Sequence, residues 1–346
     1  YKSGSTPYRD LFASINLQAD EVIFGRDYEA SLSVLHNVQN YENSTTMGRP
    51  GMNKKIVNSY LMADGSRFTD KAGYETMTFE QECQNRDPRL AQTIRTPGYT
   101  RIGSTKKEAP NLAYTMTGYH LIKYSMTANY DEYNKSCNDI PLFRTAEVYL
   151  NFAEAKAELG TLKQADINKS IKLLRDRVGM TNLDMELANS KPDPYLMSAA
   201  TGYPNVKGAN QGVILEIRRE RTIELVMEGF RYYDIMRWKA GILFENDLLG
   251  IYVPGPGTYD LDKDRTDDVC FYVGTKPAGN VPLYLEIGEL IRLSNGESGY
   301  IICHSLITKK WNEDRDYLYP VPISERTLSN GVITQNPGWN DGLNFN

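Results

Sequence analysis

The amino-acid sequence predicts a mainly α-helical fold, in which tetratricopeptide-like helical hairpins support a loop-rich subdomain and a few short strands. Two stretches, 144–178 and 212–239, carry apolar residues at intervals of three or four, which is the spacing of one helix face. Elsewhere glycine, proline and polar residues separate shorter apolar runs, and these residues are typical of turns and loops.

The stretch 144–178 predicts a pair of helices. Gly160 and Gly179 follow its two periodic runs directly, and glycine is favoured in the left-handed conformation that ends a helix. Alanines on the first helix allow a close approach of the second, so we expect a hairpin of the tetratricopeptide type, although the full repeat consensus is absent. The expected inward faces comprise Ala146, Tyr149, Leu150, Ala153 and Ala157, then Ile167, Ile171, Leu174 and Val178.

Before this hairpin, residues 1–139 are expected to form a loop-rich subdomain with short strands and one helix, and to be the part that faces a ligand. Short runs of β-branched and aromatic residues, bounded by turn residues, predict strands over 21–28, 90–96 and 115–126. The helix is predicted over 54–62, where apolar residues have helical spacing.

Residues 140–346 are expected to form a helical region with irregular insertions. The stretch 188–212 holds prolines and glycines among polar residues and predicts a loop. In the helical block 212–239, Gly229 is expected to separate two helices. From 241 to 313 the pattern predicts irregular structure with short strands or turns, and the prolines in the final segment exclude a continuous helix there.

Composition narrows the class of protein. The 346 residues are 40% apolar and 24% charged, which is typical of a folded chain, and a net charge of −5 without a basic stripe argues against a nucleic-acid partner. No apolar run reaches the about 18 residues that a membrane-spanning helix needs. The four cysteines have no CxxC spacing and no histidine at ligand spacing, so no zinc site is expected. The 24 tyrosines suit sugars, protein partners and half-buried helix surfaces alike, because their rings are flat with a hydroxyl at the rim.

Several sequence phrases occur together in one order. They are NSYLMADG at 58–65, NRDPRL at 85–90, TGYHLIKY at 117–124, RTAEVYLNFAEAKAELG at 144–160, RRERTIELVMEGFRYYDIMRWK at 218–239, YLYPVPISE at 317–325 and TQNPGW at 334–339. In this combination the chain resembles the RagB/SusD family along nearly all of its length.

The resemblance implies a SusD-like fold, with residues 140–346 as its C-terminal helical region. It implies a nutrient-binding lipoprotein of Bacteroidetes that serves polysaccharide utilization at the outer membrane, on the cell surface. Its partners would be an oligosaccharide or other nutrient and a TonB-dependent SusC-like transporter, with membrane contact only through an N-terminal lipid anchor outside this chain. No enzymatic activity and no cofactor are implied. Because the chain begins at Tyr1, without the family's helical first half, we expect it to correspond to the later part of such a protein.

The most charged helical stretch predicts a structural network of ion pairs. Glu220, Glu224 and Glu228 follow at four-residue steps and share one helix face, which Arg221 and Arg231 can reach. The expected members are Glu220, Arg221, Glu224, Glu228, Arg231, Asp234 and Arg237.

A glycoside hydrolase would use Glu224 and Glu228 differently, as general acid and nucleophile. A retaining pair must flank the sugar with carboxyl groups about 5–5.5 Å apart, and two side chains on one helix face flank nothing. Neighbouring arginines would also keep both groups ionised, whereas a general acid needs a raised pKa. The pattern therefore favours a structural role.

Five aspartates within 260–268 alternate in a way that is typical of a calcium loop. An EF-hand needs glycine and glutamate where this chain has Arg265 and Phe271. We therefore expect a solvated acidic turn and no metal site, with a weakly bound calcium ion as the only cofactor that the pattern allows. The three histidines are far apart, and GxGxxG and Walker sequences are absent, so neither histidine catalysis nor a nucleotide site is predicted.

The polar loop at 36–53 is the best candidate for ligand binding. Sugars are bound when an aromatic ring packs on their CH face and planar polar side chains take pairs of hydroxyl groups, and the loop contains both kinds of residue. An ordinary surface loop is the alternative interpretation. The candidate residues are His36, Asn40, Tyr41, Asn43 and Arg49 in the loop and Tyr74 outside it.

The resemblance and these patterns lead to three functions, in order of preference. The first, which the resemblance implies, is cell-surface binding of an oligosaccharide nutrient for delivery to a transporter. The second is a helical-repeat scaffold that binds only a protein partner, through the exposed face of the 144–178 hairpin. The third is a glycoside hydrolase, which requires reducing-sugar release that disappears in Glu224→Gln.

Overall fold

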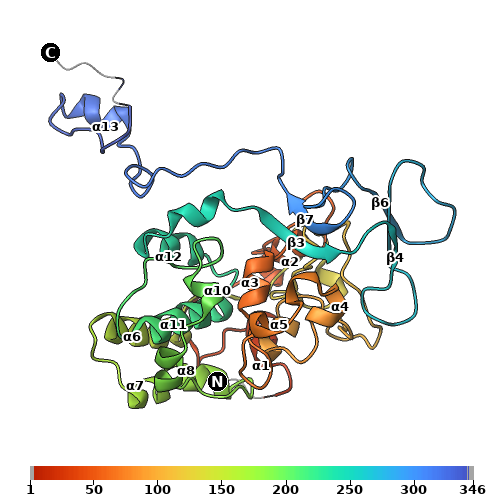
Figure 1. The fold of residues 1–346 in the computed structure, drawn as a ribbon, viewed down its shortest axis with the longest axis horizontal. Helices are drawn as coiled ribbons and strands as arrows, with labels where there is room; N and C mark the ends of the chain where they lie inside the picture. Colours follow the sequence, from red (N-terminus) through yellow and green to blue (C-terminus); the bar gives the residue numbers. More distant parts are fainter. Residues whose placement is uncertain (1–3, 341, 343–346) are drawn as a thin grey trace.

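The computed structural model describes residues 4–340 and 342, in which a helical platform (145–240) lies beside a loop-rich region (4–139) and a β region (248–303), as Figure 1 shows. The remaining residues of the two expected regions, which include Tyr1, lie outside this description. Every helix in the described part of the chain is too short or too polar to cross a lipid bilayer.

The helical platform is centred on α6 (Thr145–Glu158) and α11 (Gln211–Glu224), which pack against each other. The small inward residues of α6 are fully or almost fully buried, as their spacing predicts. The second helix of the expected hairpin is divided into α7 (Gln164–Asn168) and α8 (Ile171–Asp176). The break falls at Ser170, whose hydroxyl donates to a backbone carbonyl of the preceding turn at 2.8 Å.

Glycines end these helices as expected. Gly160 and Gly179 have φ angles of 69° and 73°, in the left-handed region that favours glycine. Gly229, with φ at 85°, lies between α11 and α12 (Arg231–Arg237), so the predicted break is confirmed.

The stretch 188–212, expected to be only loop, contains short helical turns. α9 (Met185–Ser190) begins after Asp184, whose carboxylate accepts from the Leu187 N–H group. α10 (Pro194–Met197) begins with a proline after a capping aspartate. Capping side chains and a proline at the first helical position favour such turns even in a polar segment.

The loop-rich region has more helices and fewer strands than expected. The prediction of one helix is wrong, because the described part contains five short α-helices. The strands expected over 90–96 and 115–126 are also absent from it; a single bridge between Ile94 and Leu121 is all that pairs them. Pro88 and its preceding aspartate start a helix instead. The helices are α1 (Pro7–Phe12), α2 (Val38–Glu42), α3 (Lys54–Ser59), α4 (Phe79–Glu82) and α5 (Pro88–Ala91).

The strand expected over 21–28 is present as β1 (Val22–Arg26). It pairs antiparallel with β2 (Ile140–Arg144), which leads directly into α6. The outer side of this pair exposes large apolar side chains, among them Phe24 and Phe143, whose rings stack with centroids 6.1 Å apart.

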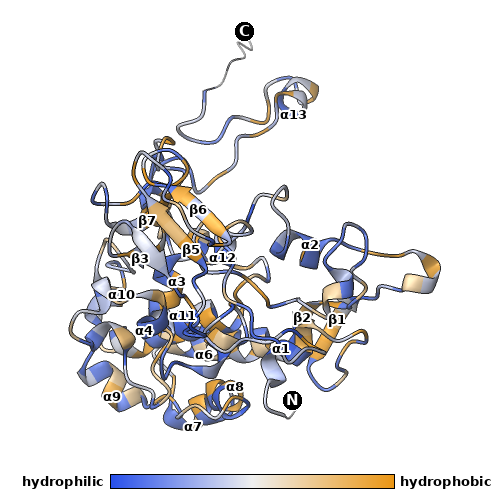
Figure 2. Cartoon of the chain, turned by 90° about the vertical axis from the view of Figure 1, so that its right-hand side faces the viewer, coloured by the Kyte–Doolittle hydropathy of each residue, from blue (hydrophilic) through white to orange (hydrophobic). Residues whose placement is uncertain are grey.

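The β region consists of two small sheets. β3 (Leu248–Val253) pairs antiparallel with β7 (Gly299–Cys303). β5 (Val269–Tyr272) lies between β4 (Gly257–Tyr259), antiparallel to it, and β6 (Leu283–Glu286), parallel to it. Figure 2 shows the apolar colouring of β6 and β7, and their inward side chains share one core with the loop-rich region. A single core therefore joins segments from both halves of the chain.

The last helix, α13 (Ile323–Leu328), lies apart from the body in both views, at the end of a long irregular segment (Figures 1 and 2). It follows Pro322, in agreement with the prolines that exclude a continuous helix here. Its apolar side chains are largely uncovered, since Leu328 is 81% exposed.

Candidate functional site

A buried cluster of ion pairs lies where the helical platform meets the loop-rich region. At its centre, Glu224 accepts hydrogen bonds from Arg144 Nη1 at 2.7 Å, Arg177 Nη2 at 2.6 Å and Arg89 Nη1 at 3.0 Å. The other acids are paired with cations in the same way, and all members are almost completely shielded from solvent. We call this set the charge cluster: Glu21, Asp87, Glu220, Glu224 and Glu228 with Arg89, Lys123, Arg144, Arg175 and Arg177.

Seven of the ten members of the charge cluster come from the sequence phrases that underlie the family resemblance; Glu21, Arg175 and Arg177 lie outside them. Arg89 belongs to NRDPRL, Lys123 to TGYHLIKY and Arg144 to the phrase that opens α6, while three glutamates come from α11 and the turn after it. These phrases are far apart in the sequence, but their charged side chains meet at one buried point. The residues that carry the resemblance therefore also hold distant segments of the chain together.

The electrostatics of the charge cluster favour ionised carboxylates. Burial alone would raise the pKa of Glu224, but the guanidinium groups of Arg177, Arg144 and Arg89 hold it well below its usual range. The pKa values of Glu220 and Glu228 are lowered as well, because neighbouring cationic side chains outweigh the effect of burial. A general acid must hold a proton at neutral pH, so these glutamates are suited to structure rather than to glycoside hydrolysis.

The arginines expected to join these glutamates lie elsewhere. Arg221 Nε donates to both carboxylate oxygens of Asp234 at 2.7 Å, and Arg237 joins Asp234 to Glu154. Arg231 donates to two hydroxyl groups and, within the described part, to no carboxylate. The expectation that Arg221 and Arg231 reach the glutamate face is therefore wrong, because α12 places Asp234 beside Arg221. The seven residues do not form one network.

Three of the predicted ligand-binding side chains are engaged inside the chain. His36 Nε2 is 2.9 Å from a backbone carbonyl oxygen, and Asn40 Nδ2 donates to another at 2.8 Å. Asn43 Oδ1 accepts from two arginine guanidinium groups. Burial lowers the pKa of His36, so its ring is neutral at pH 7. These contacts hold α2 in place, and they occupy polar atoms that a sugar would need.

The other three predicted residues are more accessible but do not converge. Tyr41 is 50% exposed on α2. Arg49 donates to a backbone carbonyl and lines a cavity of about 350 Å³ with His304 and several aliphatic side chains. Tyr74 is half-buried and packs edge-on against Tyr195, with ring centroids 6.4 Å apart.

A cleft of about 290 Å³ opens at the end of β3 and combines aromatic with polar groups. We call it the tyrosine cleft. Its walls are residues 78–80 at the start of α4, 251–254 in and after β3, and 258–261 in and after β4. At the end of β3 the side chains alternate: Ile251 and Val253 are buried, whereas Tyr252 is half-buried on the other face and lines the cleft.

Tyrosine rings continue from the cleft along the neighbouring surface. The ring of Tyr252 lies edge-on to that of Tyr300 on β7, with centroids 5.7 Å apart. The Tyr300 hydroxyl donates to the carbonyl of Glu75, directly after Tyr74. Tyr259 on the opposite wall packs against a buried phenylalanine, also with centroids 5.7 Å apart. Of the predicted ligand residues, Tyr74 alone lies beside this row of rings.

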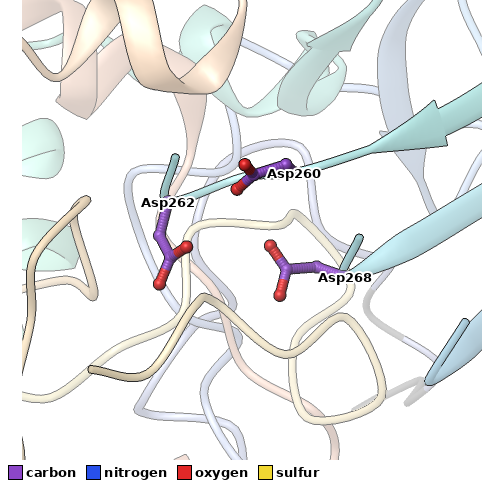
Figure 3. A group of neighbouring side chains, drawn as sticks. All are labelled: Asp260, Asp262 and Asp268. Carbon is purple, nitrogen blue, oxygen red and sulfur yellow. The ribbon is translucent and has the colours of Figure 1, made fainter. Parts of the chain in front are cut away.

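An acidic turn follows the cleft wall. Carboxylate oxygens of Asp260, Asp262 and Asp268 lie within 4.8 Å of one another, and Figure 3 shows the three groups pointing toward a common space. Backbone N–H groups of Asp264 and Arg265 donate to Asp260 at 3.2 and 2.9 Å. Carboxylates at this spacing can share a cation, and the weakly bound calcium ion stays a prediction.

The sequence contains a pattern that indicates the tyrosines of the cleft, but it lies in strands, so a search for polar loops does not find it. Ile251, Tyr252 and Val253 alternate as expected for a half-buried strand, and Tyr300 stands in a similar alternation. Such a pattern places the tyrosine of each strand on the outer face. Which outward tyrosines meet in space depends on the pairing of β3 with β7, which sequence spacing does not specify.

Comparison with known proteins identifies the fold. A family model described as the SusD family matches residues 20–339. A SusD-like protein from Bacteroides fragilis NCTC 9343 is 22% identical, with a TM-score of 0.61 over 98% of this chain and 59% of its own. A SusD-like carbohydrate-binding protein from the same organism is also 22% identical, with a TM-score of 0.56 over 94% of this chain and 57% of its own. The chain thus spans less than two thirds of the structures it matches, and the predicted mainly helical SusD-like fold is confirmed. No curated protein matches the sequence.

Proposed function

The chain belongs to the SusD family, and from this membership we propose that it binds an oligosaccharide nutrient in the tyrosine cleft and holds it without chemical change. The observation that carries the proposal is the outward ring of Tyr252 in a cleft that also presents hydroxyl and carboxylate groups. An aromatic face packs on the CH face of a sugar, and the polar groups around it bond the hydroxyls.

The cleft determines how such a ligand is held. Its volume of about 290 Å³ is at the lower end of small-molecule sites, so a chain of sugars would extend along the row of rings toward Tyr300. Much of the ligand then stays in water, and the affinity should be modest because few of its hydroxyl groups are fully desolvated.

Family membership supports a wider role for the whole protein. We propose that it resides at the outer membrane, on the cell surface, through an N-terminal lipid anchor. There it would capture the oligosaccharide and deliver it to a TonB-dependent SusC-like transporter. Hydrolysis of the ligand is not part of this proposal, since the paired glutamates on α11 are buried and ionised.

Calorimetry with oligosaccharides tests the proposed site through Tyr252→Ala. An aromatic contact is worth on the order of 1 kcal/mol, so the variant should bind about fivefold more weakly. Tyr233→Ala is the matched control, because this tyrosine is 66% exposed on α12 and lies outside the cleft; its affinity should be unchanged.

Two results would count against the assignment. Full affinity in Tyr252→Ala together with a loss in Tyr41→Ala would move the site to the loop at 36–53. A protein that binds peptides or another nutrient, and no saccharide, would refute the sugar as ligand.

A scaffold for a protein partner is the second candidate function. It is favoured by one observation: Val148 and Phe152 on α6 are 52% and 41% exposed, and Phe143 on β2, the strand that leads into α6, is exposed as well. A double Val148→Asp, Phe152→Asp variant should lose a protein partner in co-purification while it keeps its affinity for oligosaccharide. If neither the native protein nor the variant binds a sugar, and the variant alone loses the protein partner, the scaffold would be the main function.

A further inference from the structure

Carboxylates outnumber cations around the tyrosine cleft. Glu80, Asp260 and Asp267 line it, and Lys263 is the one cation in its described lining. Asp262, Asp264 and Asp268 belong to the same acidic turn but line a neighbouring cavity, together with Lys106 and Lys107. Across residues 4–340 and 342, no ion pair joins any of these six carboxylates to a lysine or arginine, whereas every acid of the charge cluster is paired.

The carboxylates of the acidic turn repel one another, so additional negative charge beside them is unfavourable. Burial raises the pKa of Asp268 to about 6, and repulsion from Asp262, Asp260 and Asp264 adds to the shift. A single backbone N–H group, that of Leu261, donates to this carboxylate, at 2.7 Å. The carboxylates of the turn therefore act on one another through space, and its two members in the cleft lining, Asp260 and Asp267, would act on a ligand in the same way.

We infer that the tyrosine cleft selects uncharged oligosaccharides and rejects those that carry carboxylate or sulfate groups. This inference rests on the proposed function and adds a class of ligand to it. Stacking on Tyr252 and Tyr259 is indifferent to the charge of the sugar, so discrimination must come from the surrounding carboxylates. They lower the local concentration of anions and leave hydroxyl groups with ready acceptors.

A glycan array gives the first test, with neutral, uronate-containing and sulfated oligosaccharides as probes. We expect the bound probes to be neutral. Binding concentrated among the acidic probes would overturn the charge selection and leave the oligosaccharide function intact. Binding of no probe at all would overturn the proposed function and this inference together.

A matched pair of ligands then isolates the charge. The best neutral probe and its C6-oxidised uronate form differ only in the carboxylate, and at low salt the oxidised form should bind about tenfold more weakly. Raising sodium chloride toward about 0.5 M should narrow this ratio, because salt screens charges that are exposed to solvent.

Charge-neutral variants complete the test. Glu80→Gln with Asp267→Asn should bring the two affinities closer together, while the control pair Asp20→Asn with Glu186→Gln, at exposed positions outside the cleft, should leave the ratio unchanged. Measurements are made with EDTA and again with calcium chloride. Tight binding of the oxidised form in either buffer would overturn the inference; if it needs calcium, the acidic turn recruits acidic glycans through a bridging cation.

Discussion

Replacing Glu224 by glutamine tests what the charge cluster contributes to the fold. The side chain is fully buried and accepts hydrogen bonds from the guanidinium groups of Arg89, Arg144 and Arg177. In the native protein five acids balance five bases in this space. Glutamine keeps nearly the same volume and one carbonyl acceptor, but it removes a negative charge and turns an acceptor into a donor that faces cations.

The expected cost is large. Removing one partner of a buried ion pair typically lowers the free energy of unfolding by about 3–5 kcal/mol, because the remaining charge is desolvated without compensation. Three guanidinium groups lose their shared negative charge and one of its two acceptor oxygens here, so the upper part of that range applies. Against a total stability of about 5–15 kcal/mol, a loss of about 5 kcal/mol is at least a third of the total, so the variant should unfold at a clearly lower urea concentration.

Urea unfolding followed by circular dichroism measures this effect directly. Glu186→Gln is the control, since Glu186 is exposed on α9, and its free energy of unfolding should stay within about 0.5 kcal/mol of the native value. A change below about 1 kcal/mol in Glu224→Gln would refute the structural role of the charge cluster. If the variant folds normally and a measurable hydrolase activity disappears, the catalytic reading of Glu224 is restored.

Three further changes have defined outcomes. Burial raises the pKa of Glu42 to about 7, so the protonated group favours folding most at low pH. As the pH rises from about 4.5 through 7, up to about 3 kcal/mol of the free energy of unfolding is lost. Glu42→Gln should remove this pH dependence, which urea midpoints at pH 5 and pH 8 would show. Gly250→Ala places a methyl group against the backbone carbonyl oxygen of Thr117, so it should lower the free energy of unfolding by about 2 kcal/mol and weaken sugar binding. Urea unfolding and calorimetry measure the two effects. Unchanged values would mean that β3 can shift away from Thr117 without cost. Brief trypsin digestion should cut first after exposed Lys310 and release α13, which mass spectrometry detects; initial cuts within α6 or α11 would contradict the position of this segment outside the body.

The sequence predicts the helical platform well because its elements depend on local rules. The buried alanines of α6, the left-handed glycines after α6 and α8 and the break at Gly229 each follow from spacing within about one helical turn. The sequence predicts the loop-rich region poorly, since its helices are short and most of them begin at a proline or a capping side chain. Such short elements depend on tertiary contacts more than on periodicity.

The candidate site shows a different limit. Polar residues near an aromatic ring, as at His36 to Asn43, predicted a ligand loop, but the same amide groups serve equally to tie a loop to its own chain. The tyrosine cleft is assembled from three segments more than 150 residues apart at the extremes, from Thr78 to Tyr259. No local pattern specifies that meeting, which follows from the shared core beneath β3 and β5.

The charge cluster also decides whether the chain can be divided. Cleavage between residues 139 and 140 would leave Glu21, Arg89 and Lys123 on one fragment and the side chains with which they form ion pairs, in or next to α6, α8 and α11, on the other. Neither half would then fold by itself, but a mixture of the two should reassemble, as complementing fragments do when each supplies what the other lacks. A segment boundary that looks natural in the sequence thus runs through the middle of one cooperative unit.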